Sequence, residues 1–174
     1  MNIRLKLENE HSKSLTLQIV DYIGNDSKKF KELTSVFLSS DNRLSQRAAW
    51  PISYIASAHP ELIKPYFGIF IKKLRDNSQH PAIHRNILRA FEEIDIPEKY
   101  QAELLDECVK FITASHYPAA VRAFAISVAT NISKQHKELA NELKLIFNEL
   151  TQYPQQPAIR VRVKRSMNEL GKIK

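Results

Sequence analysis

The chain is predicted to be all-α and folded as a stack of antiparallel helix pairs, on the strength of three observations. Proline recurs at a near-constant interval, because Pro60 and Pro97 stand 37 residues apart and so do Pro81 and Pro118. Only three glycines occur among 174 residues, which disfavours a fold rich in tight turns. Apolar residues recur at spacings of three and four along most of the chain, as they do on one face of a helix.

Each recurring proline is expected to mark the start of a helix. Proline is tolerated in the first helical turn because its missing N–H would have no partner there. Asp26 and Asp41 are expected to cap helix starts, since their carboxylates can accept N–H groups of the first turn. With breaks at the Gly-, Asn-, Asp- and Pro-containing corners, the sequence predicts nine helices, at about residues 14–23, 27–39, 43–58, 61–75, 82–94, 98–114, 118–133, 136–150 and 158–171.

Helices that are buried on several sides alternate with helices that are half exposed. In the segment 118–133, Val121, Ala125 and Val128 form one apolar stripe, and Ala123 and Ile126 make a second face apolar too. A helix with such a pattern is expected to be buried on more than one side. The helix predicted at 61–75 instead carries an apolar stripe opposite a basic face. Stacked helical hairpins produce this alternation, because each hairpin covers the core of its neighbour.

One position near the start of the first helix of each unit also repeats. Arg47, His84, Arg122 and Arg160 follow one another at intervals of 37, 38 and 38 residues. With this period and its Pro-led helix starts, nearly the whole chain resembles HEAT or armadillo-type α-solenoids. The resemblance implies that the repeated arginines hydrogen-bond carbonyls or acids between adjacent repeats. A ladder of ligand-binding arginines is the alternative.

The same resemblance implies a right-handed α-solenoid of about four to five stacked antiparallel helix pairs. A length of 174 residues suits one domain. We therefore expect a single domain over 1–174, with repeat units at approximately 14–40, 41–76, 77–115 and 116–153 and a partial capping unit at 154–174. In solenoids of this type the second helix of each pair lines the concave face. Here these would be the helices at 27–39, 61–75, 98–114 and 136–150.

The net charge of +7 and the pI near 9.5 invite a nucleic-acid-binding hypothesis. The charge is concentrated at one end, however. Residues 155–174 hold six Lys or Arg and one Glu, which supplies five of the seven net positive charges. The rest of the chain is close to balanced, and this weakens the case for a nucleic acid.

A small basic strip is predicted on the second helix at 61–75. Lys64, Lys72 and Arg75 fall within about 80° of one another on a helical wheel, with Gly68 between them. A partner's backbone, carboxylate or phosphate could approach at the glycine. The next second helix is mixed in sign, which favours a protein or peptide partner over DNA. The alternative is that the strip is an ordinary solvated helix face.

The last helix is basic around much of its circumference, through Arg160, Arg162, Lys164 and Arg165. A terminal repeat must keep its outer side polar, so these residues are expected either to form a charged cap or to bind an anionic partner. The chain is similar, in repeat architecture only, to HEAT-like DNA alkylation-repair glycosylases, which bind damaged duplex with basic and aromatic side chains. Trp50 lies on a helix predicted to be buried, and it is expected in the core.

No motif for catalysis, cofactor binding or metal binding is found. Glycine-rich phosphate loops, nucleophile elbows and His-Glu-x-x-His motifs do not occur in the sequence. The single Cys108 cannot form an internal disulfide and is expected to be a buried, inert thiol. His80 and His84 have a spacing that can place two imidazoles on one metal, but a zinc site needs a third or fourth ligand.

The sequence therefore predicts a non-enzymatic helical-repeat scaffold that binds a protein or peptide partner on its concave face. The alternative is a nucleic-acid-binding protein, for which a role in DNA repair is one hypothesis. The segment from Met1 to Ser14 lacks the apolar core of a signal peptide, and no run approaches the 18 apolar residues of a membrane span. A cytoplasmic protein is expected, and the oligomeric state is left open.

Overall fold

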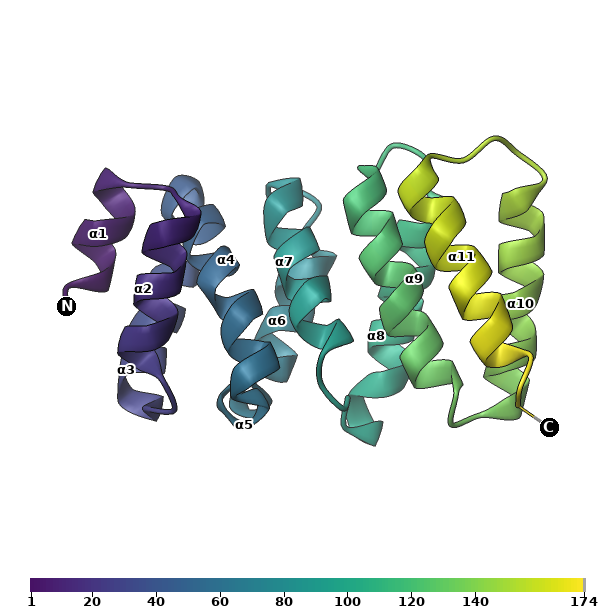
Figure 1. The fold of residues 1–174 in the computed structure, drawn as a ribbon, viewed down its shortest axis with the longest axis horizontal. Helices are drawn as coiled ribbons and strands as arrows, with labels where there is room; N and C mark the ends of the chain where they lie inside the picture. Colours follow the sequence, from purple (N-terminus) through teal and green to yellow (C-terminus); the bar gives the residue numbers. More distant parts are fainter. Residues whose placement is uncertain (174) are drawn as a thin grey trace. The chain divides into compact units, whose positions relative to one another are not determined.

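The computed structural model describes residues 1–173, and within them it contains helices and no strand (Figure 1). The predicted all-α fold is confirmed. The helices are α1 (Ile3–Asn9), α2 (Lys13–Ile23), α3 (Ser27–Phe37), α4 (Asn42–Ala58), α5 (Pro60–Ile63), the 3-10 helix η1 (Lys64–Tyr66), α6 (Phe67–Arg75), α7 (Pro81–Glu92), α8 (Glu98–Thr113), α9 (Ala119–Ser133), α10 (Lys137–Thr151) and α11 (Pro157–Leu170).

Eight of the nine predicted helices are present as single helices, and their ends lie within two residues of the prediction. The ninth, predicted at 61–75, is wrong as a single helix because it is divided into α5, η1 and α6. Pro65 explains the break, since it has no N–H to donate and its ring clashes with the carbonyl four residues earlier. Lys64 keeps helical backbone angles, and the chain departs from them at Tyr66. The two expected caps are confirmed: Asp26 accepts from the N–H of Lys28 and Lys29, and Asp41 accepts from that of Leu44.

Helix α1 is missing from the prediction because its sequence signal is short. Only Ile3 and Leu7 are buried in it, a single pair of apolar residues one turn apart. The Asn2 side chain caps its start by accepting from the N–H of Leu5, at 3.0 Å. A seven-residue helix is marginal alone and is stabilised by packing. Contacts with α3 and α4 supply that packing.

The chain forms two compact units, Met1–Asp95 and Ile96–Lys174, each of which is described by itself. The extent of a single domain over 1–174 stays a prediction. In the first unit α2, α4 and α7 lie side by side in one layer, and α3 and α6 lie behind them in a second layer (Figure 1). We call these the first-helix and second-helix layers.

Aromatic rings join the two helices of the second layer in the first unit. Phe37 of α3 meets Phe70 of α6 edge to face, with ring centroids 5.3 Å apart. Phe30 of α3 meets Tyr66 of η1 in the same way, at 5.5 Å. Edge-to-face rings at these distances add stability beyond the apolar area they bury. These ring contacts fix α3 and α6 relative to each other, and with them the outward faces of both helices.

The second unit is organised around α9, which contacts α8, α10 and α11. Ala123 and Ile126 of α9 are both buried, so the prediction that this helix is covered on more than one side is confirmed. A buried hydroxyl pair links it to the last helix, because Thr130 Oγ1 and Ser166 Oγ are hydrogen-bonded at 2.8 Å. Inside an apolar interface such a bond satisfies both polar groups.

A polar side chain at the fourth residue of a first helix bonds a carbonyl at the end of the preceding second helix. The last four carbonyls of a helix have no partner within it, so a buried helix end needs one from elsewhere. The bonds are Ser45 Oγ to Phe37 O (2.6 Å), His84 Nε2 with Asp76 O (3.2 Å), and Arg122 Nε and Nη2 to Ile112 O (3.1 and 2.9 Å).

This register corrects the repeat predicted from the sequence. Because α4 begins at Asn42, its fourth residue is Ser45 and not Arg47. Arg47 instead donates from Nη1 to the carbonyls of Leu7 and Glu8, at 2.7 and 3.1 Å, and so caps the end of α1. The expected hydrogen bonding between adjacent units is confirmed for Arg122. Arg47 also bonds carbonyls, but they belong to α1, which lies before the first predicted unit.

At Arg160, the fourth residue of α11, the pattern changes again. Its side chain is exposed, and Gln155 in the preceding loop takes over the bonding of the helix end. Gln155 Nε2 donates to Leu150 O at 3.0 Å. The bond expected from Arg160 is therefore replaced by one from the loop residue Gln155 to the end of α10.

We expect the change Arg122→Ala to lower the free energy of unfolding by about 1–3 kcal/mol, because the buried Ile112 carbonyl loses its charged donor. Urea denaturation measures the loss. Arg160→Ala is the matched control: it removes the same side chain from the same helical position at an exposed site, and we expect a change within about 0.5 kcal/mol. Equal losses in the two variants would contradict the capping role of Arg122.

Glu169 joins the end of α9 to α11, since its carboxylate accepts from Lys134 and from Arg165 Nε. The hydrogen bond from Lys134 is the main reason that the pKa of Glu169 lies below its ordinary value of 4.5. A depressed carboxyl pKa contributes stability that is present above 4.5 and lost as the pH falls through the folded-state pKa.

We expect Glu169→Gln to be less stable than the original chain at pH 7 and to approach it at low pH. The free energy of unfolding of both proteins is measured at pH 7 and at pH 3. The same difference between them at the two pH values would refute this prediction.

Candidate functional site

The basic strip consists of Lys64, Gly68, Lys72 and Arg75, and all four residues are exposed. Lys64 lies in η1 and the other three lie in successive turns of α6. The opposite side of α6 is fully buried through Phe67, Phe70, Ile71 and Leu74. The strip is therefore the outward face of a helix whose inner face belongs to the core.

Two apolar residues next to the basic strip were missed by the sequence analysis. Pro65 is exposed, and Ile69 keeps 42% of its surface in contact with solvent. Their helical spacing places them beside Lys64, Gly68 and Lys72. The signal was present in the sequence, because Ile69 lies outside the apolar stripe of its own helix. The surface thus combines positive charge with apolar area.

Lys73, although adjacent in sequence, does not belong to the basic strip. Its Nζ donates to Ser45 Oγ at 3.0 Å and to Gln79 Oε1 at 3.2 Å, and it lies 5.0 Å from the centroid of the Phe37 ring. Burial lowers the pKa of Lys73. This lysine ties α6 to α4 and to the turn after α6, which is a structural role.

Acidic residues near the basic strip are partly engaged in local contacts. Asp76 accepts hydrogen bonds from Ser78 Oγ at 2.6 Å and from Gln79 Nε2 at 2.5 Å, and these bonds lower its pKa. On the neighbouring helix α3, Lys28 and Lys31 are exposed. The second-helix layer of the first unit therefore carries more exposed positive than negative charge.

The four basic residues predicted on the last helix are not brought together on one face. Arg160 and Lys164 are exposed one turn apart on α11. Arg165 donates from Nε to Glu169 at 3.0 Å. Arg162 is half-buried against α9, where it donates to Ser127 Oγ and its guanidinium lies 5.3 Å from the centroid of the Phe124 ring. The four residues thus have three different environments.

The prediction that Trp50 lies in the core is wrong. Its ring is half-buried and packs at 5.3 Å, centroid to centroid, against the exposed His11. Helix α4 buries the neighbouring residues Ala49 and Pro51, so Trp50 falls on the edge of its solvent-facing stripe. The apolar run in the sequence concealed that edge.

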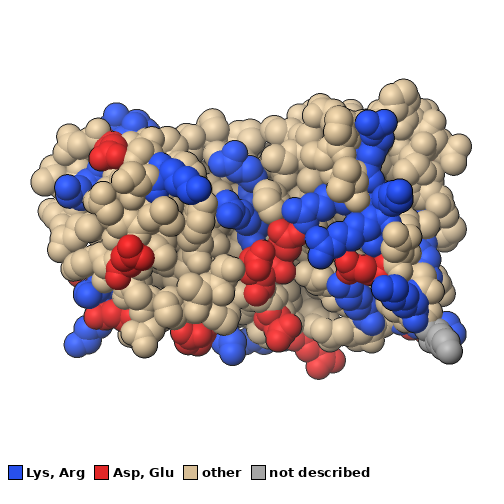
Figure 2. All heavy atoms as spheres, viewed as in Figure 1, with Lys and Arg blue, Asp and Glu red and all other residues tan. Residues whose placement is uncertain are grey.

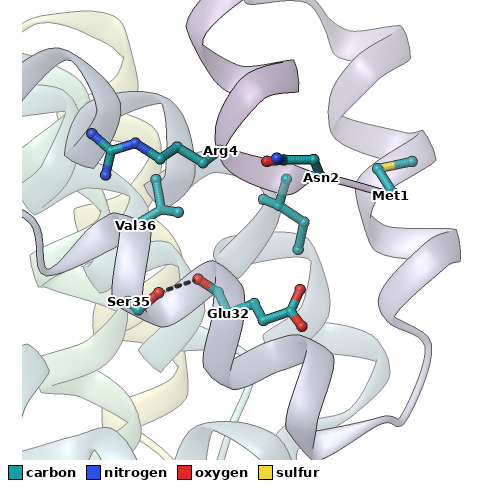
Figure 3. A pocket seen from close by; sticks show the side chains of 7 residues that line it. Met1, Asn2, Arg4, Glu32, Ser35 and Val36 are labelled. Atoms are coloured by element: carbon teal, nitrogen blue, oxygen red, sulfur yellow. Dashed lines mark hydrogen bonds between the residues drawn. The ribbon is translucent and has the colours of Figure 1, made fainter.

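A shallow hollow of about 440 Å³ lies between α1 and α3 (Figure 3). Its lining includes Asn2, Arg4 and Ser35, and none of the predicted site residues. Three of its polar side chains have local partners: Asn2 caps α1, Arg4 Nε donates to Glu8 at 3.0 Å, and Ser35 Oγ donates to Glu32 O at 2.7 Å. No set of side chains converges on a ligand in this hollow.

The residues weighed for metal or thiol chemistry have local roles. His80 Nδ1 accepts from the N–H of Ala82 at 3.1 Å and so caps α7, whereas His84 is buried against Asp76. Cys108 is fully buried, and burial raises the pKa of its thiol. Within residues 1–173, no three His, Cys, Asp or Glu side chains are grouped closely enough to hold a metal ion. None of the helices described is long and apolar enough to cross a membrane.

Comparison with solved structures places the fold among helical-repeat proteins. An engineered protein solved by a structural genomics consortium is 14% identical, with a TM-score of 0.63 over 97% of this chain and 79% of its own. A designed armadillo repeat protein, solved in complex with the peptide (KR)4, is 16% identical, also with a TM-score of 0.63, over 95% of this chain and 80% of its own. A search of curated proteins gave no match.

A family model for the HEAT repeat domain matches residues 3–170, which is nearly the whole chain. This match and the two solved structures confirm the predicted HEAT/armadillo-type α-solenoid fold. The same architecture is indicated by three features of the chain itself: the period of 37–38 residues, the Pro-led helix starts and the hydrogen bonds at the helix ends. The chain belongs to the HEAT repeat domain family.

Proposed function

We propose that this chain is a non-enzymatic scaffold that binds an acidic peptide or protein segment on the basic strip of α6. The observation that carries the proposal is the exposure of Gly68 and Lys72 on α6, whose other face is buried in the core, with the exposed Lys64 preceding them in η1. A rigid support reduces the entropy that a binding surface loses when a partner docks. A cytoplasmic site of action is part of the proposal.

The composition of the strip supports a partner that is both acidic and apolar. Lys64 and Lys72 can bind carboxylates, and Gly68 lets a partner's backbone approach closely because it has no side chain. Ile69 and Pro65 offer apolar area beside these charges. An acidic segment with interspersed leucine or isoleucine residues would satisfy both features. Charge complementarity of this kind raises specificity and association rate more than affinity.

The designed armadillo repeat neighbour supports peptide binding on this architecture. The charge of the partner is expected to differ from that of the neighbour's ligand. Its solved complex holds (KR)4, a basic peptide. The strip of the present chain is itself basic, so the same basic peptide would be repelled. We therefore expect selectivity for acidic over basic peptides, the reverse of the neighbour's ligand.

A nucleic-acid partner for the last helix is the second candidate, favoured by the exposure of Arg160 and Lys164 one turn apart on α11. Arg162 and Arg165 have partners within the chain, which reduces the charge available for phosphates. A salt series distinguishes the candidates, because phosphate contacts release counterions and lose affinity steeply as salt rises. A gel shift with duplex DNA that is absent at low salt would remove this candidate.

We expect a fluorescein-labelled 12-residue peptide of alternating Glu and Leu to bind the chain, and its Lys/Leu counterpart not to bind. Lys72→Glu should weaken the acidic peptide at least fivefold, because it replaces an attractive charge by a repulsive one. Fluorescence anisotropy measures both affinities at 50 mM salt. Ile69→Asp should weaken binding to a similar extent through the apolar contact.

Lys13→Glu is the matched control, since Lys13 is exposed on α2 in the first-helix layer. It makes the same change in net charge away from the basic strip, and we expect its affinity to stay within twofold of the original. Equal weakening by Lys13→Glu and Lys72→Glu would show that only net charge matters. That result, or equal binding of the acidic and basic peptides, would refute the proposed site.

A further inference from the structure

The first-helix layer of the first unit carries a second surface, which we call the arginine–aromatic cluster. It consists of Arg47, Trp50 and Tyr54 of α4 and Arg85 and Arg89 of α7. All five residues are half-buried, so each is partly open to solvent. None of these residues belongs to the basic strip on α6.

The five residues form one continuous surface. Arg47, Trp50 and Tyr54 occupy successive turns on one side of α4, and Arg85 and Arg89 do so on α7. These two helices pack against each other more extensively than any other pair in the unit. The Arg89 guanidinium lies 4.6 Å from the centroid of the Tyr54 ring, which closes the gap between the helices.

The positive charge of the cluster is not neutralised by its own contacts. Arg47 donates to two backbone carbonyls, which satisfy its hydrogen bonds and leave its charge in place. Arg89 lies against a ring. The pKa of His11, beside Trp50, is lowered first by burial and then by the charges of Arg47 and Arg85, which places His11 close to both arginines.

Figure 2 shows the same distribution, with Lys and Arg atoms over α4 and α7 and acidic atoms near the end of α7. Glu92 and Glu93 lie at that end, and Ser57 of α4 donates to Glu93 at 3.4 Å. The acidic pair therefore bounds the positive surface without crossing it. Such a boundary limits how far an anionic ligand could extend along α7.

We propose that the arginine–aromatic cluster binds single-stranded nucleic acid. Guanidinium groups match the geometry of phosphate oxygens and keep their charge at every physiological pH. The Trp50 and Tyr54 rings lie between them and are partly exposed. Arg89 covers one face of Tyr54 and His11 packs against Trp50, so an unpaired base would stack on the part of each ring that stays exposed. An acidic peptide would engage the arginines and leave the two rings without a matching group. A duplex would present phosphates and no base face.

The position of Trp50 provides a direct measurement, because it is the single tryptophan of the 174 residues. A base stacked on its ring should quench its fluorescence. We expect titration with the oligonucleotide dT12 at 50 mM salt to quench Trp50 in a saturable manner. If three phosphates are neutralised, the logarithm of the association constant should fall with the logarithm of salt with a slope of about −2.

The test variant is Arg85→Glu with Arg89→Glu, and it should weaken dT12 binding at least tenfold. Arg47 is left unchanged because it also caps α1. The control is Arg160→Glu with Lys164→Glu, which makes the same change in net charge on α11 and should stay within twofold. Far-UV circular dichroism and thermal melting check that both variants keep the helical fold. Tyr54→Leu is a milder variant, which removes a ring without changing the charge.

Three results would overturn the inference. The first is the absence of Trp50 quenching by dT12 at 50 mM salt. The second is equal loss of binding in the α11 control, which would assign the oligonucleotide to the last helix. The third is equal quenching by a poly-glutamate peptide of the same charge, which would make the cluster a site for acidic protein segments.

Discussion

The architecture depends on how the chain satisfies the carbonyls at the end of each second helix when it turns back into the next first helix. Those carbonyls are buried or partly buried at the corner, and leaving a buried one without a donor costs about 1–3 kcal/mol. Ser45, His84 and Arg122 meet this need from the same helical position with three different donors. The constraint therefore fixes a place in the helix and a bonding capacity, and it leaves the residue type free.

That freedom explains what could and could not be predicted from the sequence. The Pro-led starts and the 37–38 residue period gave the helices and the repeat family. They did not identify Ser45 as the equivalent of His84. A serine in an apolar run is inconspicuous, and Arg47, two residues later, fitted the repeated Arg and His positions better. Helix α1 was missed because two buried residues are too few to show a helical periodicity. The division at Pro65 could have been anticipated from the chemistry of proline alone.

The two candidate surfaces differ in how far the sequence could reveal them. The basic strip was predicted from spacing within one helix, and its four residues are exposed although Lys64 lies in η1 and the other three in α6. The arginine–aromatic cluster needs two helices to come together, so it became visible only when Arg89 of α7 was found against Tyr54 of α4. Trp50 was assigned to the core because burial was inferred for the whole helix rather than for its individual faces. The two surfaces lie on different helix layers of one unit and differ in chemistry, one apolar and basic, the other aromatic and basic.

The corner contacts can be tested at the level of single amides. Hydrogen exchange of Arg122→Ala, followed by mass spectrometry, compares the last turn of α8 with helices that Arg122 does not touch. We predict faster exchange confined to the end of α8 and the start of α9, with unchanged exchange in α3 and α6, because loss of a cap frays the helix end it held. Unchanged exchange at the end of α8 in a correctly folded variant would contradict the account.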